Sequence, residues 1–580
     1  MNVSELLLKI LEKEGVRHIF GVAGDALNPL VSALAGQDAI RWVRVKHEGN
    51  ASYAAYAQGA LNNNIGVCAS TVGPGALHLV NGLYNAKRER VPLLAITGQI
   101  PAEKRGKNFF QEVDLQKMFD DICAYQAIVR TPGEAGAVMR KAIRIAINSK
   151  TVCRIELSAD IADEEVPDNE ENPGEVFRAK STTLPSEEML KKAAGLINEA
   201  ENIGILGGAG CRDAREEVLE FAERIKAPIT HTLRASDIFD HDTDPVVGLT
   251  GLIGNNSGYR AVMDCDLLIM LGTNFPYTDY LPRKNKVIQV DIRPESIGNR
   301  IPVTIGLHGD VKHTVAALSE LSNKKDKSAF QDELRKSFTE WKKEQAEKED
   351  TESDLEPMHP QVLAGLLSKS ASADAIFAIE TGTSAIWSSN HMSFHSDRRI
   401  LGSFNHGSMA VGLPAAIGAQ LAFPEREVWA MAGDGAFHMT LHDFSTAVEY
   451  GLPVKIIVFN NSELGFVKIE MEEAGLAPNF DALQVNNFDF AQFARVCGGD
   501  GISISRAEEV ETAIEKAKSS AKPFIIDAKV TKGELSMPPE ISVGQAANFG
   551  ISKAKEVLKA IGGNKKQWEN LKKEIESLLD

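Results

Sequence analysis

The chain has 580 residues and a mass of 62.9 kDa, which at about 150 residues per domain predicts three to four domains. With 43% apolar and 25% charged residues, the composition is that of a soluble globular protein and excludes a disordered or collagen-like chain. The net charge of −17 argues against binding of nucleic acid or anionic lipid through overall electrostatics. Any anionic ligand must therefore be held by a local site.

The six cysteines are scattered and include no C-x-x-C pair, which argues against a disulfide scaffold and a structural zinc site. A reducing compartment fits this usage best. The N-terminal residues lack a basic segment followed by an apolar one, and no run reaches the ~18 uncharged apolar residues of a spanning helix. We therefore expect a cytoplasmic protein that is neither secreted nor integral to a membrane.

The first block, residues 1–180, alternates short β-rich runs with helical stretches. We predict strands at residues 18–22, 41–45, 65–70 and 93–97, with helices between them, such as 51–61 and 77–88. This alternation predicts a parallel sheet covered by helices, with ligands beyond the carboxyl ends of the strands. The acidic and proline-containing stretch 164–185 is typical of a linker.

The second block, residues 186–325, repeats this pattern after a helix that begins near Ser186. Its predicted strands are residues 203–206, 267–271 and 287–290. The first two run into glycine-rich segments and the third ends on an aspartate, so we expect a second α/β sheet. The strongly charged residues 326–356 predict a solvated helical connector to the third block.

The third block, residues 357–530, has predicted strands at 375–379, 428–432, 455–459 and 524–528. The first and third blocks look like two versions of one domain type. The predicted fold class is therefore α/β, with three doubly wound parallel-sheet domains and a short helical tail at 531–580. In that tail, apolar residues from Trp568 to Leu579 fall at helical spacing. We weigh docking on the protein itself and binding to a membrane surface equally.

One motif in the third block carries most of the chemical information. Gly433, Asp434 and Gly435 end one predicted strand, and Asn460 and Asn461 end the next. Because parallel neighbours end at one sheet edge, a carboxylate and an amide oxygen would meet there and suit Mg²⁺ bridging to phosphates. The glycines permit close approach of a diphosphate, and the following helix offers free N–H groups. An Asp-Gly pair alone would indicate a turn, but the Asn-Asn pair favours the ligand site.

These motifs resemble those of the thiamine-diphosphate-dependent decarboxylase and oxidase superfamily, with Glu48 at the position of its catalytic glutamate. Four segments resemble the narrower pyruvate:quinone oxidoreductase family of acetate-forming pyruvate oxidases: residues 250–254, 271–277, 402–409 and 537–541. The resemblance runs from about residue 3 to 550. It implies that the three blocks are a pyrimidine-binding, an FAD-binding and a diphosphate-binding domain, in that order.

The resemblance implies three cofactors, thiamine diphosphate, Mg²⁺ and FAD. Glu48 would hydrogen-bond the pyrimidine ring and promote loss of the thiazolium proton, and Met409 would hold the cofactor bent. Asp434, Asn461 and the backbone carbonyl of Glu463 would hold Mg²⁺. The other residues implied to contact thiamine diphosphate are Gly24, Asp25, Gly73, Thr383, His406, Gly407, Gly433, Gly435, Ala436, Leu464 and Gly465.

In the second block, the glycine-rich strand exits and the acidic strand end predict only a nucleotide-like ligand. The resemblance narrows this to FAD, with implied contacts at Gly208, Gly210, Arg212, Thr250, Gly251, Gly272, Asn274, Asp291, Arg293, Asp310 and Val311. It also implies that Phe110, Gln111 and Phe466 line the substrate and flavin side of the site. His406 is expected to touch substrate or pyrimidine.

The implied reaction is the oxidative decarboxylation of pyruvate to acetate and CO₂ through a hydroxyethyl adduct, with electrons passed through FAD to a membrane quinone. The alternatives are a pyruvate oxidase that uses O₂ and phosphate, an acetolactate synthase with structural FAD, and an inactive cofactor-binding scaffold. The resemblance further implies active sites between the subunits of a dimer or tetramer. It makes the tail a candidate for contact with the inner face of the membrane.

Three features depart from these patterns or compete with them. Gly49 follows Glu48 where a second Glu is common, and Glu380 replaces a usual Asp, which concerns substrate tuning more than cofactor binding. Two histidine pairs, 391/395 and 438/442, have the i,i+4 spacing of a zinc-binding helix. Met439 stands where that zinc motif needs Glu, so the pattern argues against a metal role.

Overall fold

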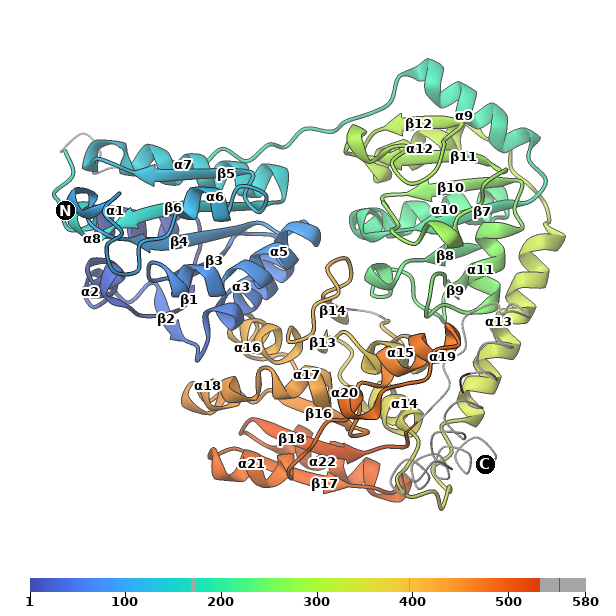
Figure 1. Ribbon diagram of the computed structural model, residues 1–580. Coiled ribbons are helices and arrows are strands. Elements are labelled where there is room, and N and C mark those ends of the chain that lie inside the picture. The colour runs from blue at the N-terminus through green and yellow to red at the C-terminus, as the bar shows by residue number, and fades with distance from the viewer. Residues whose placement is uncertain (168–173, 396, 533–551, 553–580) are drawn as a thin grey trace.

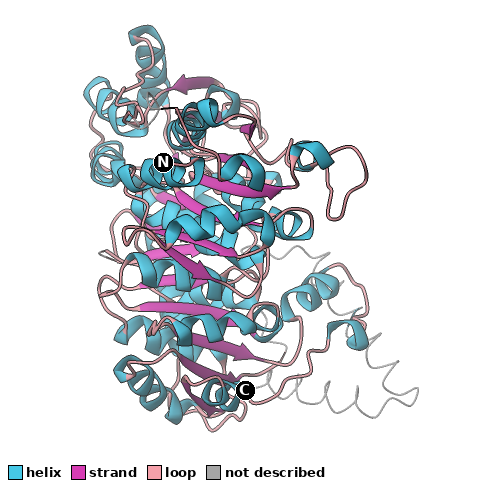
Figure 2. Cartoon of the chain, turned by 90° about the vertical axis from the view of Figure 1, so that its left-hand side faces the viewer, coloured by secondary structure: helices cyan, strands magenta, loops and turns pink. Residues whose placement is uncertain are grey.

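The computed structural model of the protein describes residues 1–167, 174–395, 397–532 and residue 552. Within these residues the chain forms three six-stranded parallel sheets, each flanked by helices (Figure 1). In the side view of Figure 2, helices lie on both faces of the strands. The predicted α/β class is therefore confirmed. The predicted tail, apart from residues 531, 532 and 552, lies outside the described residues. We call each sheet with its helices the first, central or third unit.

The first unit has the strand order β2-β1-β3-β4-β6-β5. Its strands are β1 (His18–Val22), β2 (Arg41–Arg44), β3 (Gly66–Ser70), β4 (Leu93–Gln99), β5 (Tyr125–Val129) and β6 (Val152–Ser158). Its helices are α1 (Val3–Lys13), α2 (Asn28–Leu34), α3 (Glu48–Asn62), α4 (Pro74–His78), α5 (Val80–Arg88), α6 (Leu115–Met118), α7 (Pro132–Ser149) and α8 (Ala159–Ala162). All four strands predicted here are present.

Two strands of the first unit were missed by the sequence analysis for different physical reasons. The edge strand β5 is only partly buried, so it lacks a continuous apolar run. In β6 the apolar run is interrupted by Arg154 and Glu156, which are both buried and form an ion pair at 3.1 Å. A search for apolar runs therefore misses a buried strand that contains a pair of opposite charges.

The central unit has the order β12-β11-β10-β7-β8-β9, so β7 and β10 are neighbours and later strands extend the sheet in opposite directions from them. Its strands are β7 (Ile203–Gly207), β8 (Ile229–His231), β9 (Val246–Leu249), β10 (Leu267–Leu271), β11 (Lys286–Asp291) and β12 (Ile305–His308). Its helices are α9 (Glu187–Glu199), α10 (Arg215–Ile225), α11 (Asn256–Met263) and α12 (Val311–Leu321). This is the strand order of dinucleotide-binding sheets, whose ligands bind where the order reverses.

The third unit has the order β14-β13-β15-β16-β18-β17, which repeats the order of the first unit strand for strand. Its strands are β13 (Ile376–Ile379), β14 (Arg399–Gly402), β15 (Val428–Gly433), β16 (Lys455–Asn460), β17 (Asp500–Ile504) and β18 (Phe524–Lys529). Its helices are α14 (Pro360–Ser370), α15 (Thr383–His391), α16 (Gly412–Ala422), α17 (Asp434–His438), α18 (Phe444–Glu449), α19 (Gly465–Glu473), α20 (Phe480–Leu483), α21 (Phe490–Val496) and α22 (Val510–Ser519). The expectation that the first and third blocks are two versions of one sheet is confirmed.

One apolar core spans the first and third units, and α3 and α16 pack closely within it. A Cβ atom on Gly418 of α16 would lie 2.2 Å from the carbonyl oxygen of Ala54 in α3. Only glycine fits such an approach, so small residues bring the two helices together. The start of α3 is thereby fixed relative to the third sheet.

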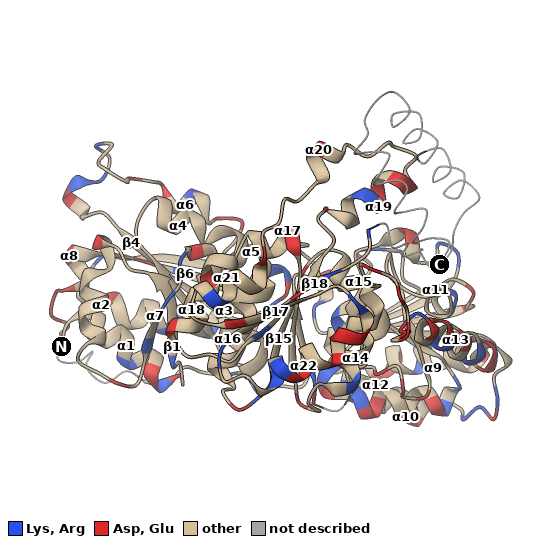
Figure 3. Cartoon of the chain, turned by 90° about the horizontal axis from the view of Figure 1, so that it is seen from below, with Lys and Arg blue, Asp and Glu red and all other residues tan. Residues whose placement is uncertain are grey.

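The charged segment after the central unit contains the long helix α13 (Ala329–Glu347). It is more than the solvated connector predicted from its charge, because Phe330, Leu334 and Phe338 are buried in a core of the central unit. Acidic and basic residues are interspersed over α9, α10, α12 and α13 (Figure 3). In the part of the chain that the structure describes, no helix has the length and apolarity to cross a membrane.

Candidate active site

Glu48 is placed by the turn between β2 and α3. His47 is the N-cap of α3, and its Nδ1 atom accepts a hydrogen bond from the Gly49 N–H at 3.1 Å. Glu48 is the first residue of the helix and is only 9% exposed. The positive end of the helix dipole favours a carboxylate at this position.

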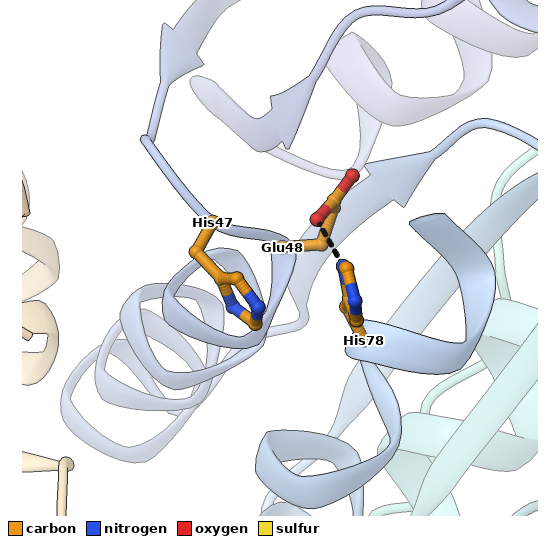
Figure 4. A group of neighbouring side chains, drawn as sticks. All are labelled: His47, Glu48 and His78. Carbon is orange, nitrogen blue, oxygen red and sulfur yellow. Dashed lines mark hydrogen bonds and ion pairs between the residues drawn. The ribbon is translucent and has the colours of Figure 1, made fainter. Parts of the chain in front are cut away.

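Glu48, His47 and His78 lie together at the helix start (Figure 4). Nδ1 of His78 lies 2.9 Å from Oε2 of Glu48, and because a carboxylate only accepts, His78 donates. The rings of His47 and His78 stack with centroids 4.4 Å apart. A Cβ atom on Gly75 would lie 3.0 Å from Oε1 of Glu48, so glycine leaves room for the second oxygen. The side chain is thus oriented through both oxygens.

The same three side chains are close enough to hold a metal ion, with ligand atoms within 4.8 Å of one another. However, Nδ1 of His47 already accepts an N–H, so a metal on Nε2 would require both ring lone pairs. Metal-binding histidines normally donate from their second nitrogen. Burial, followed by the neighbouring His78, lowers the pKa of His47 and keeps it neutral. The cluster therefore suits proton handling better than metal binding.

Asp443 of the third unit fixes the Glu48 turn from outside the first unit. It is fully buried, and its Oδ1 atom accepts from the backbone N–H of Lys46 at 2.8 Å and from the Thr446 hydroxyl at 2.6 Å. Its Oδ2 atom accepts from the side chain of Asn50. Since Lys46 and Asn50 stand on either side of Glu48, the third unit holds the turn at two points.

The exits of the neighbouring strands β1 and β3 bring three predicted residues to one edge of the first sheet, where Gln111 from the loop after β4 joins them. A Cβ atom on Gly24 would lie 2.5 Å from Thr71, whose hydroxyl donates to Asp25 at 3.4 Å. Gly73 has φ +64°, and a Cβ atom there would lie 2.7 Å from the carbonyl oxygen of Gln111. Gly24, Asp25, Gly73 and Gln111 are therefore grouped at this edge. The adjacent Phe110 is 75% exposed.

The predicted magnesium ligands follow the adjacent parallel strands β15 and β16. Asp434 is 2% exposed and accepts from the N–H groups of Gly435 at 2.8 Å and Ser462 at 2.7 Å, and from the Asn487 amide at 2.7 Å. A carboxylate has about four lone-pair directions, so three are used and one suits a cation. Burial raises the pKa of Asp434, although these hydrogen bonds oppose the shift.

Several of the other predicted residues of the third unit contact one another near the ends of β15 and β16. Asn461 accepts from the Glu463 N–H at 3.1 Å, which ties the loop after β16. A Cβ atom on Gly435 would lie 2.7 Å from Leu464 and 3.7 Å from the Met409 methyl group. A Cβ atom on Gly465 would lie 2.8 Å from Asn461 and 3.4 Å from Thr383. Gly433 ends β15, Ala436 is buried in α17, Gly407 has φ +69°, and Phe466 packs against the core of the third unit.

His406 belongs to the segment after β14, residues 403–409, which we call the His406 loop. Its Nε2 atom lies 2.9 Å from Oδ1 of Asn81, and its ring stacks on Tyr84 at 5.2 Å. Asn81 also donates to the Ser408 hydroxyl at 3.0 Å. Burial, followed by Arg88, lowers the pKa of His406 and favours the neutral ring. The loop of the third unit thus lies on α5, which directly follows His78.

In the central unit, the exits of β7 and β10 meet at the point where the strand order reverses. Gly210 donates its N–H to the carbonyl of Gly272 at 3.0 Å, and a Cβ atom on Gly210 would lie 2.7 Å from the Cα of Gly272. A Cβ atom on Gly208 would lie 2.5 Å from Thr273. The buried hydroxyl of Thr250, beside Gly251 with φ +103°, has no hydrogen-bond partner among the described residues. An unpaired buried hydroxyl costs about 1–3 kcal/mol, which a bound ligand could offset.

The other predicted residues of the central unit already have protein partners. Arg212 forms an ion pair with Asp237 at 2.7 Å, and Asn274 accepts from Arg300 at 3.0 Å. Asp291 is buried and accepts from the Arg293 N–H at 2.9 Å, and burial raises its pKa. Asp310 caps α12, and Val311 is buried at the start of that helix. Asp310 and Val311 thus stabilise the start of α12.

Models of three protein domains match this chain. They are the N-terminal TPP binding domain of thiamine pyrophosphate enzymes at residues 1–118, the central domain at 190–318 and the C-terminal TPP binding domain at 380–528. The chain belongs to the thiamine pyrophosphate enzyme family.

Several relatives are similar to this thiamine pyrophosphate enzyme over nearly its whole length. The putative thiamine pyrophosphate-containing protein YdaP of Bacillus subtilis is 35% identical, over 100% of this chain and 99% of the relative. Pyruvate oxidase of Lactiplantibacillus plantarum is 28% identical, over 92% and 89%. A probable acetolactate synthase large subunit of Methanocaldococcus jannaschii is 31% identical, over 93% and 94%.

Sequence reasoning missed several polar residues that shape the site of this thiamine pyrophosphate enzyme. His78 follows the β3 exit and could have been found by examining strand exits, whereas Asn487 lies in an irregular segment that no periodicity marks. His438 and His442, considered above for their zinc spacing, bond separately, to Asn487 at 2.9 Å and to Asn50 at 3.0 Å. Their spacing therefore reflects two hydrogen-bonding roles.

Proposed function

We propose that the protein catalyses the oxidative decarboxylation of pyruvate to acetate and CO₂, with electrons passed through FAD to a quinone. The observation that carries the proposal is the His406 loop, whose sequence resembles that of pyruvate:quinone oxidoreductases. In the structure this loop contacts Asn81 and Tyr84. Both residues follow closely after His78, the hydrogen-bond partner of Glu48. The loop brings the imidazole of His406 against α5 of the unit that carries Glu48, the carboxylate that we propose to be catalytic. Pyruvate oxidase among the relatives supports the same substrate.

The residues fit thiamine diphosphate and Mg²⁺. When bound, thiamine diphosphate supplies the electron sink that allows a 2-keto acid to lose CO₂. Asp434, Asn461 and Glu463 would hold Mg²⁺ at the edge where β15 and β16 end. Glu48 would move the proton that activates the cofactor, and His78 would hold that carboxylate in place. His406 would donate to or accept from the substrate's oxygen atoms.

The central unit fits a dinucleotide such as FAD. Its strand order reverses between β7 and β10, glycines at both exits permit close approach of a phosphate, and the Thr250 hydroxyl needs a partner. A flavin bound there would supply the two-electron carrier between the substrate and the quinone. For use of a membrane quinone, we propose a cytoplasmic enzyme that contacts the inner face of the membrane peripherally. We assign that contact to the tail.

We further propose a dimer or tetramer with active sites between subunits. Support comes from Phe110, which is 75% exposed beside the Gly73 and Gln111 edge of the first sheet. A large exposed aromatic next to predicted cofactor contacts suits a site completed by a second copy. The substrate and flavin side of the proposed site comprises Phe110, Gln111 and Phe466.

The test is turnover by purified protein with pyruvate, thiamine diphosphate, Mg²⁺, FAD and a water-soluble ubiquinone analogue. We expect equal amounts of acetate and reduced quinone, and loss of both in Glu48→Gln. Phosphate-dependent acetyl phosphate and peroxide would instead identify an O₂-using oxidase. Acetolactate without reduction of the flavin would identify a synthase. Turnover at the same background rate in the wild type and in Glu48→Gln would identify an inactive scaffold.

A further inference from the structure

A buried carboxylate in the first unit joins all three units at one point. Glu89, just after α5, is fully buried. Its Oε2 atom forms an ion pair with Nε of Arg234 of the central unit at 3.0 Å, and Arg234 also donates to the Glu89 carbonyl. Its Oε1 atom accepts the backbone N–H of Asn405 of the third unit at 2.6 Å. In Figure 1 the chain after β14 projects between the first and central units.

The position of this contact matters because Asn405 directly precedes His406. The amide of Asn405 adds contacts to both Glu89 oxygens at 3.3 and 3.2 Å, so the backbone and side chain of one loop residue are bound. A buried carboxylate is tolerated only when it is paired, and charge-assisted hydrogen bonds are short and directional. Glu89 therefore fixes where the His406 loop begins its approach to α5.

A second buried carboxylate fixes the strand that leads into the loop. The side chain of Asp237, in the central unit, is fully buried, and its Oδ1 atom pairs with Arg212 at 2.7 Å. Its Oδ2 atom accepts from Nε of Arg399 at 3.3 Å and from the N–H of Ile400 at 3.2 Å. Arg212 is one of the residues expected to contact FAD, so Asp237 connects β14 to a predicted ligand contact of the central unit.

We propose that Glu89 and Asp237 are positioning residues that attach the His406 loop and its strand to the central unit. Neither is among the residues expected to contact cofactor or substrate, and each acts through the loop or its strand. The central unit thereby sets the geometry of His406 in addition to holding its own ligand. The consequence for turnover rests on the proposed function, whereas the attachment of the loop does not.

The attachment is tested without activity by hydrogen–deuterium exchange of the full-length protein. In Glu89→Gln we expect amide exchange in residues 403–409 to be at least about tenfold faster, because the charged acceptor is replaced by a neutral amide, which weakens the hydrogen bond from Asn405 and removes the ion pair with Arg234. The matched control is Glu14→Gln. Glu14 is also buried, accepts a backbone N–H at 3.1 Å and pairs with Arg178 at 3.1 Å, all within the first unit. Exchange in 403–409 should be unchanged in the control.

Asp237→Asn provides a second test should Glu89→Gln fold poorly, and it should loosen residues 399–402. Unchanged exchange of the loop and strand in the folded variants, or equally faster exchange throughout the chain, would overturn the proposal. If the wild type turns over pyruvate, Glu89→Gln introduced into it should lower kcat/KM about tenfold. The same substitution introduced into His406→Ala should have no further effect. A full additional loss in that background would contradict action through the loop. Absence of turnover in the wild type would count against the proposed function alone.

Discussion

The hydrogen bond from His78 to Glu48 makes a specific prediction for catalysis. Substitution of His78 by Phe keeps a ring that can stack on His47 and removes the donor 2.9 Å from the carboxylate. A hydrogen bond to a charged group contributes about 1.5–3 kcal/mol. The Glu48 side chain is 11% exposed but that of His78 is 47% exposed, so water replaces part of the bond and the lower value applies.

A loss of about 1.5 kcal/mol corresponds to a roughly tenfold lower kcat, since 1.36 kcal/mol is one factor of ten in rate. Steady-state turnover of pyruvate with saturating thiamine diphosphate and Mg²⁺ measures this change. His78→Asn is the matched variant, because its amide nitrogen can occupy the position of Nδ1 and restore most of the rate. If His78→Phe keeps kcat within twofold of the wild type while its unfolding midpoint is unchanged, the reasoning is refuted.

Three other substitutions test separate parts of the molecule. Gly210→Ala places a Cβ 2.7 Å from the backbone of the β10 exit and should purify with little flavin, whereas Gly195→Ala, with open space around it, should bind flavin normally by absorbance. Asp434→Asn removes the charged magnesium ligand and should raise the Mg²⁺ needed for half-maximal cofactor binding at least about 10–100-fold in fluorescence titrations; an unchanged requirement would exclude Asp434 as a ligand. Burial raises the pKa of Glu380 from 4.5 to about 7, so the stability due to its protonated form is lost as pH rises over that interval. Between those pH values, the free energy of unfolding of Glu380→Gln should rise by up to about 3 kcal/mol relative to that of the wild type, as measured by thermal unfolding. Parallel pH profiles of the two proteins would contradict this.

The central strands of each sheet could be predicted because strands buried on both faces give continuous apolar runs that end on glycine or a polar residue. Strands β7, β10, β15 and β16 show this: glycine-rich segments follow the first two, and Asp434 and Asn461 follow the last two. Edge strands such as β17, with the polar start Asp500-Gly501, give no such run. Their existence depends on pairing with a neighbour that only the tertiary structure supplies.

In the candidate site, too, some residues could be predicted from local sequence and others depend on the tertiary structure. Asp434, Asn461 and Glu48 stand at strand exits or helix starts, which local sequence marks. The residues that hold them, such as Asp443 and Asn487, come from other parts of the chain and bond through side chains whose partners are hundreds or tens of residues away. The sequence indicated that the first and third units are two versions of one domain type, whereas their shared strand order and the buried charges that join the units came from the structure.

The most direct test of the account is anaerobic reduction of the flavin by pyruvate. The holoprotein is mixed with pyruvate, thiamine diphosphate and Mg²⁺ without an acceptor, and the flavin absorption band is followed before and after addition of a quinone analogue. We predict rapid bleaching that requires Glu48 and recovery of the yellow colour on addition of quinone. Consumption of pyruvate with the flavin band unchanged, or failure of the reconstituted protein to retain flavin, would contradict the central claim.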